Sequence, residues 1–315
     1  MNLKKRASQQ FLFVLAIVLA LLQFGCQSRP TLLTKNGEPF RFVFATDVHL
    51  EPDPLSIERF DQAIAAINGL KPKPQFVIMG GDLIENSYTL DLEGADRLYR
   101  LYQDACLKFG MPVHHIVGNN EIIGWSKASR VASSRPEFGK GMFRQRLGQG
   151  ATYGSFDHGP WHFILLDSIE RNEDPGLESD IKGMINEDQL KWLSEDLEKT
   201  GKTRPVCIAL HIPLSSIFYQ THLDTLAAPA QSRMVNNGTA VIRLLAKYNV
   251  RIVLQGHVHI VEELRYKNTT YITGGSLSNA RKDPNFEHPD GFVVVDVKGD
   301  EFRWKYVAYP WTSKE

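Results

Sequence analysis

The sequence predicts an α/β fold in which mostly parallel strands alternate with helices packed outside the sheet. Short apolar runs rich in β-branched and aromatic residues alternate with longer segments whose apolar residues recur at helical spacing. The chain has 315 residues, 43% hydrophobic and 23% charged, which is the composition of an ordinary globular protein. Each of the first three apolar runs also ends in polar residues, and open α/β sheets bind ligands at such strand ends.

The first half of the domain is predicted to run strand, helix, strand, helix, strand. Strands are expected at 40–45, 76–79 and 113–117, because these runs are apolar and β-rich. The first helix is expected to begin at Ser56 as its N-cap and to end before Gly69. The second is expected over residues 90–109, where apolar residues share one helical face. This order favours parallel pairing of the three strands.

The second half continues this pattern and closes with antiparallel strands. A hairpin is expected over residues 156–167, with its turn at Gly159-Pro160. Helices are expected over 186–199, with Asn186 as N-cap, and over 239–248. The remaining strands are expected at 206–210, 251–255, 262–267, 270–273, 291–297 and 302–307, the last four antiparallel.

Residues 1–25 are predicted to be an export signal. Basic residues at positions 4–6 precede an unbroken apolar run over 11–22, which is the layout of a secretory signal peptide. This run is shorter than the about 20 residues that a transmembrane helix needs. We therefore expect an exported protein in the periplasm or cell envelope. Residues 26–39 are polar and turn-rich and are read as a tether to the domain.

Cys26 is a candidate lipidation site. Gly25 before Cys26 resembles the lipobox of bacterial lipoproteins, although Gln23 stands where that pattern has an aliphatic residue. The resemblance implies that Cys26 becomes a lipidated first residue and attaches the chain to a membrane, while plain cleavage and a retained anchor stay open as alternatives. Of the other two cysteines, Cys207 lies in an apolar run and is expected to be a small buried hydrophobe. No disulfide is predicted.

The charge balance disfavours a nucleic-acid partner. Lys and Arg together number 36, as do Asp and Glu, and removing residues 1–25 leaves a net charge of −3. Nucleic-acid-binding domains carry a basic surface to neutralise phosphates. We therefore expect no nucleic acid among the partners.

The candidate functional residues are metal-ligand side chains that directly follow five predicted strands. They are Asp47, His49, Asp82, Asn119, His211, His257 and His259. Imidazole, carboxylate and carbonyl groups together suit divalent metals such as manganese, iron and zinc. Seven such groups exceed the about four ligands of a tetrahedral zinc ion. The set therefore favours two divalent ions that share one carboxylate.

These residues stand in motifs that resemble the calcineurin-like metallophosphoesterase signature. The motifs are Asp47-x-His49, Gly81-Asp82, Gly118-Asn119-x-Glu121, His211 and Gly256-His257-x-His259. The resemblance covers residues 41–308 and implies a single domain over 40–310. The implied architecture is a four-layer α-β-β-α sandwich, in which helices flank two mixed sheets.

The resemblance also implies how the ligands divide between two metals. One ion would be held by Asp47, His49, Asp82 and His259, and the other by Asp82, Asn119, His211 and His257. Asp82 would bridge them. The implied activity is hydrolysis of a small-molecule phosphate ester, in which a hydroxide between the ions attacks phosphorus in line with the leaving alcohol. Metal binding makes this nucleophile available by lowering the pKa of water toward about 7.

Asn120 departs from the signature, which usually has His at this position. The family His is assigned to stabilise the transition state or to protonate the leaving group. An amide still donates a hydrogen bond to a phosphoryl oxygen but delivers no proton. General acid–base catalysis typically raises a reaction rate about 10²–10⁴-fold. We therefore name Asn120 and Asp82 as catalytic candidates, with Asn120 also contacting substrate. A loose similarity to the cyclic-nucleotide phosphodiesterase branch, together with Asn120, favours a phosphodiester over a phosphomonoester.

Two stretches are expected to shape the substrate pocket. Residues 122–150 carry six basic residues without strong periodicity, so they form either a cap that meets an anionic substrate or a solvated insertion. Residues 215–235 follow His211 and should overhang the metals, which makes His222 a candidate substrate contact. Other polar residues near strand ends or in strands are read as structural: His114, His115, His158, His162, Asp157 and Asp167. A surface-anchored binding protein of the same fold, with reduced or lost turnover, is the alternative function.

Overall fold

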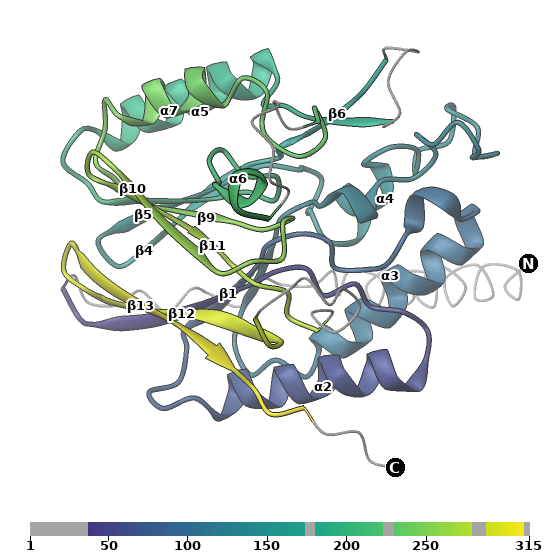
Figure 1. Ribbon diagram of the computed structural model, residues 1–315, viewed down its shortest axis with the longest axis horizontal. Helices are drawn as coiled ribbons and strands as arrows, with labels where there is room; N and C mark the ends of the chain where they lie inside the picture. The colour runs from purple at the N-terminus through teal and green to yellow at the C-terminus, as the bar shows by residue number, and fades with distance from the viewer. Residues whose placement is uncertain (1–36, 174–179, 223–229, 279–287, 312–315) are drawn as a thin grey trace, which may run out of the picture. The chain divides into compact units, whose positions relative to one another are not determined.

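Two mixed β-sheets lie at the centre of the computed structural model, with helices on their outer faces (Figure 1). The structure describes residues 37–311 except 174–179, 223–229 and 279–287, and the side chain of His222 is also outside the described part. The predicted export signal, Cys26 and nearly all of the tether therefore lie outside the described residues. No helix in the described part is long and apolar enough to span a membrane.

The first sheet has five strands in the order β13-β12-β1-β2-β3. Its strands are β1 (Phe40–Ala45), β2 (Phe76–Met79), β3 (Val113–His115), β12 (Gly291–Lys298) and β13 (Glu301–Ala308). The strands β1, β2 and β3 are parallel, while β12 is antiparallel to both β1 and β13. The predicted parallel pairing of the first three strands is thus confirmed, although β3 ends earlier than expected.

The second sheet has six strands in the order β10-β11-β9-β8-β5-β4. Its strands are β4 (Gly154–His158), β5 (Trp161–Leu165), β8 (Val206–Ala209), β9 (Val250–Gln255), β10 (Glu262–Tyr266) and β11 (Thr269–Thr273). The hairpins β4–β5 and β10–β11 are antiparallel, and β5, β8, β9 and β11 are parallel. A separate two-stranded sheet pairs β6 (Ile169–Arg171) with β7 (Ile181–Gly183) and has no counterpart in the sequence prediction.

The helices cover the outer faces of the two sheets. Helices α2 (Pro54–Gly69) and α3 (Leu92–Cys106) lie beside the first sheet, and α5 (Glu187–Thr200) and α7 (Gly238–Leu245) lie over the second (Figure 1). Shorter helices are α4 (Gly141–Arg146), α6 (Phe218–His222), η1 (Ser87–Thr89) and η2 (Asn119–Glu121). The predicted two-sheet sandwich flanked by helices is therefore confirmed.

Aromatic side chains fill the space between the sheets. Phe42 of β1 packs edge-to-face on Phe163 of β5, with ring centroids 5.3 Å apart. Phe76 of β2 meets Phe163 in the same geometry at 5.2 Å. Edge-to-face pairs add about 0.5–1.5 kcal/mol beyond the burial of their area. The two sheets are thus joined by a layer of packed aromatic side chains.

The boundaries of α2 and α3 differ from the sequence prediction, and α7 ends at Leu245 rather than at residue 248. The first helix begins at Pro54 because Asp53, not Ser56, is its N-cap, and the Asp53 carboxylate accepts hydrogen bonds from the backbone of Leu55 and Ser56. Proline suits this first helical position because its missing N–H has no helical partner there. The second helix runs over Leu92–Cys106 because Asp91 caps it by accepting from the Gly94 backbone.

Cys207 is buried, and Cys106 and Cys207 are both free thiols.

Candidate metal centre

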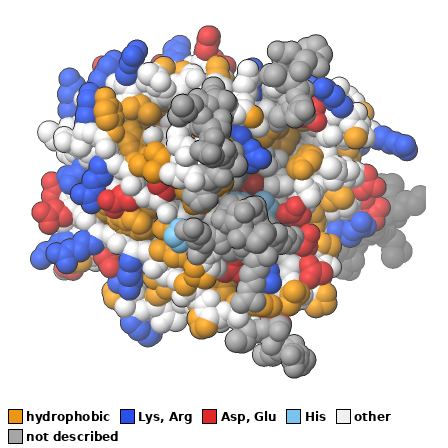
Figure 2. Space-filling view, viewed as in Figure 1, with side chains coloured by type: hydrophobic (Ala, Val, Ile, Leu, Met, Phe, Trp, Pro, Cys, Tyr) orange, Lys and Arg blue, Asp and Glu red, His pale blue; other side chains and the backbone are white. Residues whose placement is uncertain are grey.

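The seven predicted ligands follow strands of both sheets. Asp47 and His49 come after β1, Asp82 after β2 and Asn119 after β3, in the first sheet. His211 comes after β8, and His257 and His259 come after β9, in the second sheet. Parallel strands of one sheet end at the same edge, so these loops meet at one end of the sandwich. Histidine side chains reach the surface near the centre of the face in Figure 2, next to acidic side chains.

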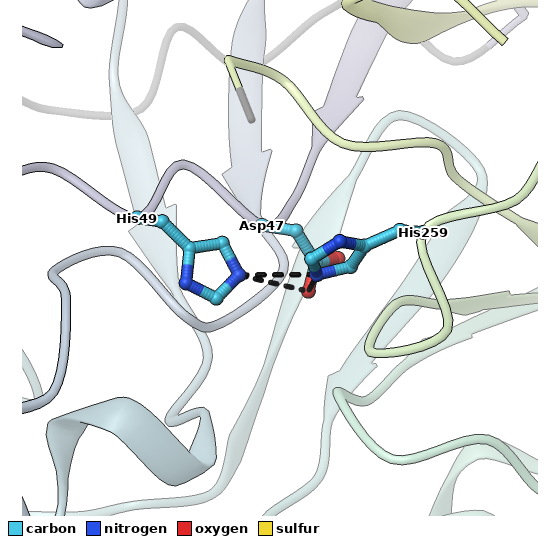
Figure 3. Close-up of side chains that lie close together, drawn as sticks. All are labelled: Asp47, His49 and His259. Atoms are coloured by element: carbon cyan, nitrogen blue, oxygen red, sulfur yellow. Dashed lines mark hydrogen bonds and ion pairs between the residues drawn. The ribbon is translucent and has the colours of Figure 1, made fainter. Parts of the chain in front are cut away.

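Asp47, His49 and His259 form one group of converging side chains (Figure 3). Nε2 of His259 lies 3.1 Å from Oδ1 of Asp47, and Nε2 of His49 lies 3.8 Å from the same oxygen. The two imidazole Nε2 atoms are 3.1 Å apart. Three potential ligand atoms therefore surround one point.

Asp82, His211 and His257 form a second group. Nε2 of His211 lies 3.3 Å from Oδ1 of Asp82 and 3.2 Å from Oδ1 of Asn119. The other oxygen of Asp82, Oδ2, lies 3.7 Å from Nε2 of His49 in the first group. The Asp82 carboxylate therefore lies between the two groups, the position that a shared ligand would take.

The backbone of these loops is held in an uncommon conformation. Among the described non-glycine residues, eight have a positive φ, and five of them are predicted ligands. These five are Asp47, His49, Asp82, His257 and His259, with φ between 48° and 72°. Left-handed backbone costs a non-glycine residue about 1–3 kcal/mol and is retained where function requires it. The conformation turns the side chains out of the strand direction and toward each other.

Two glycines allow the loops to approach this closely. Gly118 lies so close to the next loop that a Cβ would stand 2.0 Å from the backbone nitrogen of Asp82. Gly81 has a φ of +96°, and a Cβ there would lie 2.6 Å from Nδ1 of His211. Any larger residue at either position would push the ligand loops apart.

Hydrogen bonds from surrounding residues orient the ligand side chains. Nδ1 of His211 donates to the backbone oxygen of Gly80 at 2.9 Å, so Nε2 is the ring nitrogen that faces Asp82 and would bind a cation. Nδ1 of His49 lies 2.7 Å from Oε2 of Glu85. The Asp47 carboxylate accepts from Oγ1 of Thr46 at 2.7 Å and from the backbone N–H of His257 at 3.1 Å. Such outer contacts fix the tautomer and orientation of metal-ligating histidines.

Glu121 organises the loop that carries Asp82. Its buried carboxylate accepts hydrogen bonds from the backbone N–H groups of Asp82, Leu83, Ile84 and Gly118. These contacts tie the loop after β2 to the loop after β3. The acidic residue that ends the Gly118-Asn119-x-Glu121 motif is therefore a scaffold for the ligand loops.

The charges of the site favour bound cations. Burial alone would raise the pKa of Asp82, but the positive charge of His211 outweighs it, and the pKa lies well below the ordinary value. Burial would lower the pKa of His49, but its contacts with Asp47 and Glu85 raise it to about 10. The carboxylates thus demand compensating positive charge, which either protons on imidazole or divalent cations supply.

The donor set fits two divalent metal ions. Nε2 of His257 is buried and has no hydrogen-bond partner in the described part of the chain, which leaves a lone pair available for a cation. Burial and the neighbouring His211 lower the pKa of His257 to about 3, so this imidazole is neutral at pH 7. Each of the two groups offers imidazole and carboxylate atoms within 4.8 Å of one another. Imidazole and carboxylate together suit manganese, iron and zinc.

The residues predicted to contact the substrate are Asn120, His222 and the basic residues of 122–150. Asn120 is 5% exposed and its amide faces Asp82, with Nδ2 donating to Oδ2 at 2.7 Å. His222 ends helix α6, and its side chain lies outside the described residues. Three of the basic residues in 122–150 form ion pairs with the protein: Arg135 with Glu137, Lys140 with Asp167, and Arg146 with Asp96. The predicted roles of Asn120 and His222 in substrate binding stay predictions.

The histidines and aspartates read as structural make contacts away from the metal groups. His162 contacts Asp157 at 2.6 Å and Asp196 at 2.8 Å. His158 contacts Gln75 at 2.6 Å, and His114 stacks on Phe156 with centroids 3.9 Å apart. Asp167 accepts from Nζ of Lys140 at 2.6 Å.

Sequence reasoning missed one charged residue near the centre. Arg233 is exposed, and its positive charge acts to lower the pKa of both His257 and Tyr219. Its neighbour Met234 packs against a cluster that includes Tyr219 and Val258, and Val258 lies between His257 and His259. Nothing in the sequence pattern marks Arg233, because its position depends on how the 215–235 stretch folds back.

A family model described as calcineurin-like phosphoesterase matches residues 40–261. The chain belongs to the calcineurin-like phosphoesterase family. It is accordingly a metallophosphoesterase, a metal-dependent hydrolase of phosphoric ester bonds, and its two candidate metal groups agree with a dimetal centre.

Relatives of this calcineurin-like phosphoesterase include proteins named as phosphodiesterases. A probable glycerophosphodiester phosphodiesterase GpdQ of Arcobacter nitrofigilis is 26% identical over 71% of this chain and 72% of its own. A 3',5'-cyclic-nucleotide phosphodiesterase of Nostoc sp. is 24% identical over 88% of this chain and 91% of its own. The fold is similar to a dimetal phosphatase from Danio rerio, with a TM-score of 0.61 and 18% identity over 85% of this chain and 96% of that one.

Proposed function

We propose that this phosphoesterase is an exported enzyme that hydrolyses small phosphodiesters at a two-metal centre formed by the seven predicted ligands. The observation that carries this proposal is the position of the Asp82 carboxylate, with one oxygen 3.3 Å from His211 and the other 3.7 Å from His49. A carboxylate between two imidazole-rich groups is suited to join two cations. When bound, these cations would lower the pKa of water and neutralise charge on the phosphoryl oxygens.

The chain's own residues hold and shape this centre. Asp47 and Asp82 would supply the negative charge, and the histidines would supply nitrogen ligands from both sheets. Arg233 is exposed beside the second group, and its guanidinium has no hydrogen bond or ion pair within the described residues. Arginine suits two-pronged contact with phosphate oxygens. Arg233 therefore offers an unengaged positive charge to the phosphoryl group of the substrate.

The preference for a diester rests on two observations. Two relatives that cover most of this chain are named as phosphodiesterases. Asn120 also stands where the family usually has a His, and an amide delivers no proton to a leaving group. Hydrolysis of substrates with good leaving groups would suffer least from this replacement.

The test is an activity screen of the purified protein loaded in turn with manganese, iron and zinc. Bis(4-nitrophenyl) phosphate and 4-nitrophenyl phosphate serve as the paired diester and monoester. We expect faster diester hydrolysis, abolished by EDTA, by Asp82→Asn and by His257→Ala. Full activity in either variant would refute the site, and faster monoester turnover would refute the diester preference. Two bound metals without turnover on a broad ester panel would favour the alternative of a binding protein.

Export and lipidation are proposed from residues 1–26 and are tested separately. We expect the full chain, expressed in a Gram-negative bacterium, to appear in the membrane fraction of the envelope and to incorporate labelled fatty acid. Cys26→Ala should abolish this labelling, whereas Cys106→Ala, as a matched control, should not. A cytoplasmic product with an intact N-terminus would overturn the proposal for export.

A further inference from the structure

The side chain of Asn120 belongs to a continuous chain of hydrogen bonds behind the metal ligands. Its Nδ2 donates to Oδ2 of Asp82 at 2.7 Å, and its backbone N–H donates to Oδ1 of Asp82 at 2.9 Å. Its Oδ1 accepts from the backbone N–H of Asn86 at 2.9 Å. Both oxygens of the Asp82 carboxylate are therefore held by one residue.

The chain continues from Asn86 to the first ligand group. Nδ2 of Asn86 donates to Oε1 of Glu85 at 2.7 Å, and Oε2 of Glu85 lies 2.7 Å from Nδ1 of His49. Asn86 has a φ of 49°, a left-handed turn that lets its backbone N–H face Asn120 while its side chain faces Glu85. The hydrogen bonds thus connect Asp82, between the two ligand groups, with His49 of the first.

The amide of Asn120 has little freedom to do anything else. Its side-chain oxygen accepts from Asn86, one N–H of its Nδ2 donates to Asp82, and its backbone oxygen accepts a hydrogen bond from Oγ of Ser87. The residue is 5% exposed. Turning the amide toward a substrate would leave Asp82 and the Asn86 N–H without these partners inside the protein, and buried polar groups without partners are strongly disfavoured.

We propose that Asn120 is a positioning residue that acts on the metals through Asp82, rather than a catalytic residue that touches the substrate. The inference rests on the proposed two-metal function. A neutral amide donor holds the carboxylate plane so that one oxygen faces His211 and the other faces His49. It does so without placing a second positive charge beside Asp82, where that charge would compete with the cations.

Metal binding tests this inference independently of any activity. Titration of metal-free full chain with Mn²⁺ by calorimetry gives the stoichiometry and affinity for wild type, Asn120→Ala and Asn120→Leu. The leucine variant keeps the four heavy atoms and the branching of the asparagine side chain but removes its hydrogen-bond donor and acceptor. We expect both variants to bind Mn²⁺ about 10–100-fold more weakly, the usual effect of losing an outer contact to a metal ligand. Asn249→Ala is the matched control, because the Asn249 side chain donates a hydrogen bond to the backbone oxygen of Thr203 and contacts no predicted ligand. This variant should bind Mn²⁺ like wild type.

Metal rescue separates positioning from catalysis. If Asn120 acts through Asp82, raising the Mn²⁺ concentration should return most of the lost turnover in Asn120→Leu, with KM for the ester unchanged. Wild-type Mn²⁺ affinity in both variants would overturn the inference, as would a loss of kcat that saturating Mn²⁺ does not restore. Thermal unfolding of the metal-free variants checks that they are folded. If the wild type binds two Mn²⁺ ions but hydrolyses no ester, the proposed function fails while the affinities still decide the role of Asn120.

Discussion

Oε2 of Glu85 lies 2.7 Å from Nδ1 of His49 and sets which nitrogen of that imidazole faces Asp47 and His259. Because a carboxylate only accepts hydrogen bonds, Nδ1 carries a proton, and Nε2 is the ring nitrogen that would bind a cation once its own proton is displaced. The contact comes from a residue three positions after Asp82, so one loop supplies a proposed ligand and also orients another.

Removal of the Glu85 side chain should therefore weaken metal binding. We expect Glu85→Ala to lower Mn²⁺ affinity about 10–100-fold, because His49 loses the contact that fixes its tautomer. Glu85→Gln should lose less, since the amide oxygen still accepts from Nδ1. Calorimetric titration measures both, with Glu93→Ala on the exposed face of α3 as control. An unchanged affinity in Glu85→Ala would show that His49 needs no such support.

Loss of the Arg233 charge should affect substrate binding more than metal binding. We expect Arg233→Ala to raise KM for bis(4-nitrophenyl) phosphate by about tenfold, the value of one charge-assisted hydrogen bond of about 1.5 kcal/mol. Mn²⁺ affinity should stay within about twofold of wild type. Steady-state kinetics at saturating metal measure the effect, and Arg243→Ala on α7 is the control. An unchanged KM would remove Arg233 from the substrate site.

The buried ion pair between Lys140 and Asp167 should make the 122–150 stretch important for stability. Lys140 is 8% exposed, and its Nζ lies 2.6 Å from Oδ2 of Asp167. Lys140→Met would leave Asp167 charged and buried, so we expect a loss of about 3–5 kcal/mol in the free energy of unfolding. Urea denaturation measures it. Arg97→Met, which breaks an exposed pair with Glu93, should cost less than about 1 kcal/mol.

His115 should make the protein less stable in acid. Burial and the charge of His114 lower the pKa of His115 to about 3, and its Nε2 has no hydrogen-bond partner in the described residues. Between that value and the ordinary 6.5, the unfolded chain binds a proton that the folded chain does not. Stability is therefore lost as pH falls through this window, by up to about 1.4 kcal/mol per pH unit.

Replacing His115 by Gln should flatten that pH profile. Urea denaturation of metal-free protein at intervals from pH 7 to pH 4 gives the free energy of unfolding for wild type and variant. The difference between them should shrink or change sign toward low pH in favour of His115→Gln. A constant difference across this range would mean that His115 takes up its proton in the folded state as readily as in the unfolded state.

The strands and the ligand loops were predictable because they follow local patterns. A buried strand such as β9 reads as an apolar run, and the residues that follow it, His257 and His259, stand out as polar at the point where the run stops. The predicted start of α2 at Ser56 was wrong because Asp53 and Ser56 are both good caps, and Pro54, which suits the first helical position, is the sequence signal that favours Asp53. The paired strands β6 and β7 are three residues each and too short to show a period.

The contacts behind the ligands depend on tertiary structure. The sequence places Asn120 beside a metal ligand but does not show that its amide faces Asp82, because Asp82 and Asn86, which contact that amide, lie more than 30 residues away in the chain. Arg233 is brought toward this side of the fold because its neighbour Met234 packs against the cluster of Tyr219, Val258 and Ile260. Residue type and spacing therefore identify ligands, whereas the residues that orient them become visible only in the fold.

Because the ligands come from two sheets, the aromatic layer between the sheets also determines how the ligands are positioned relative to one another. Cations at this centre would be bound by two carboxylates, an imidazole and an amide from the first sheet and by three imidazoles from the second, so they would link the two sheets. A slight slip of one sheet against the other, for example after trimming Phe42 or Phe163, would change the reach of every ligand at once. Catalytic turnover would then depend on the rings of Phe42 and Phe163, although neither ring contacts the substrate.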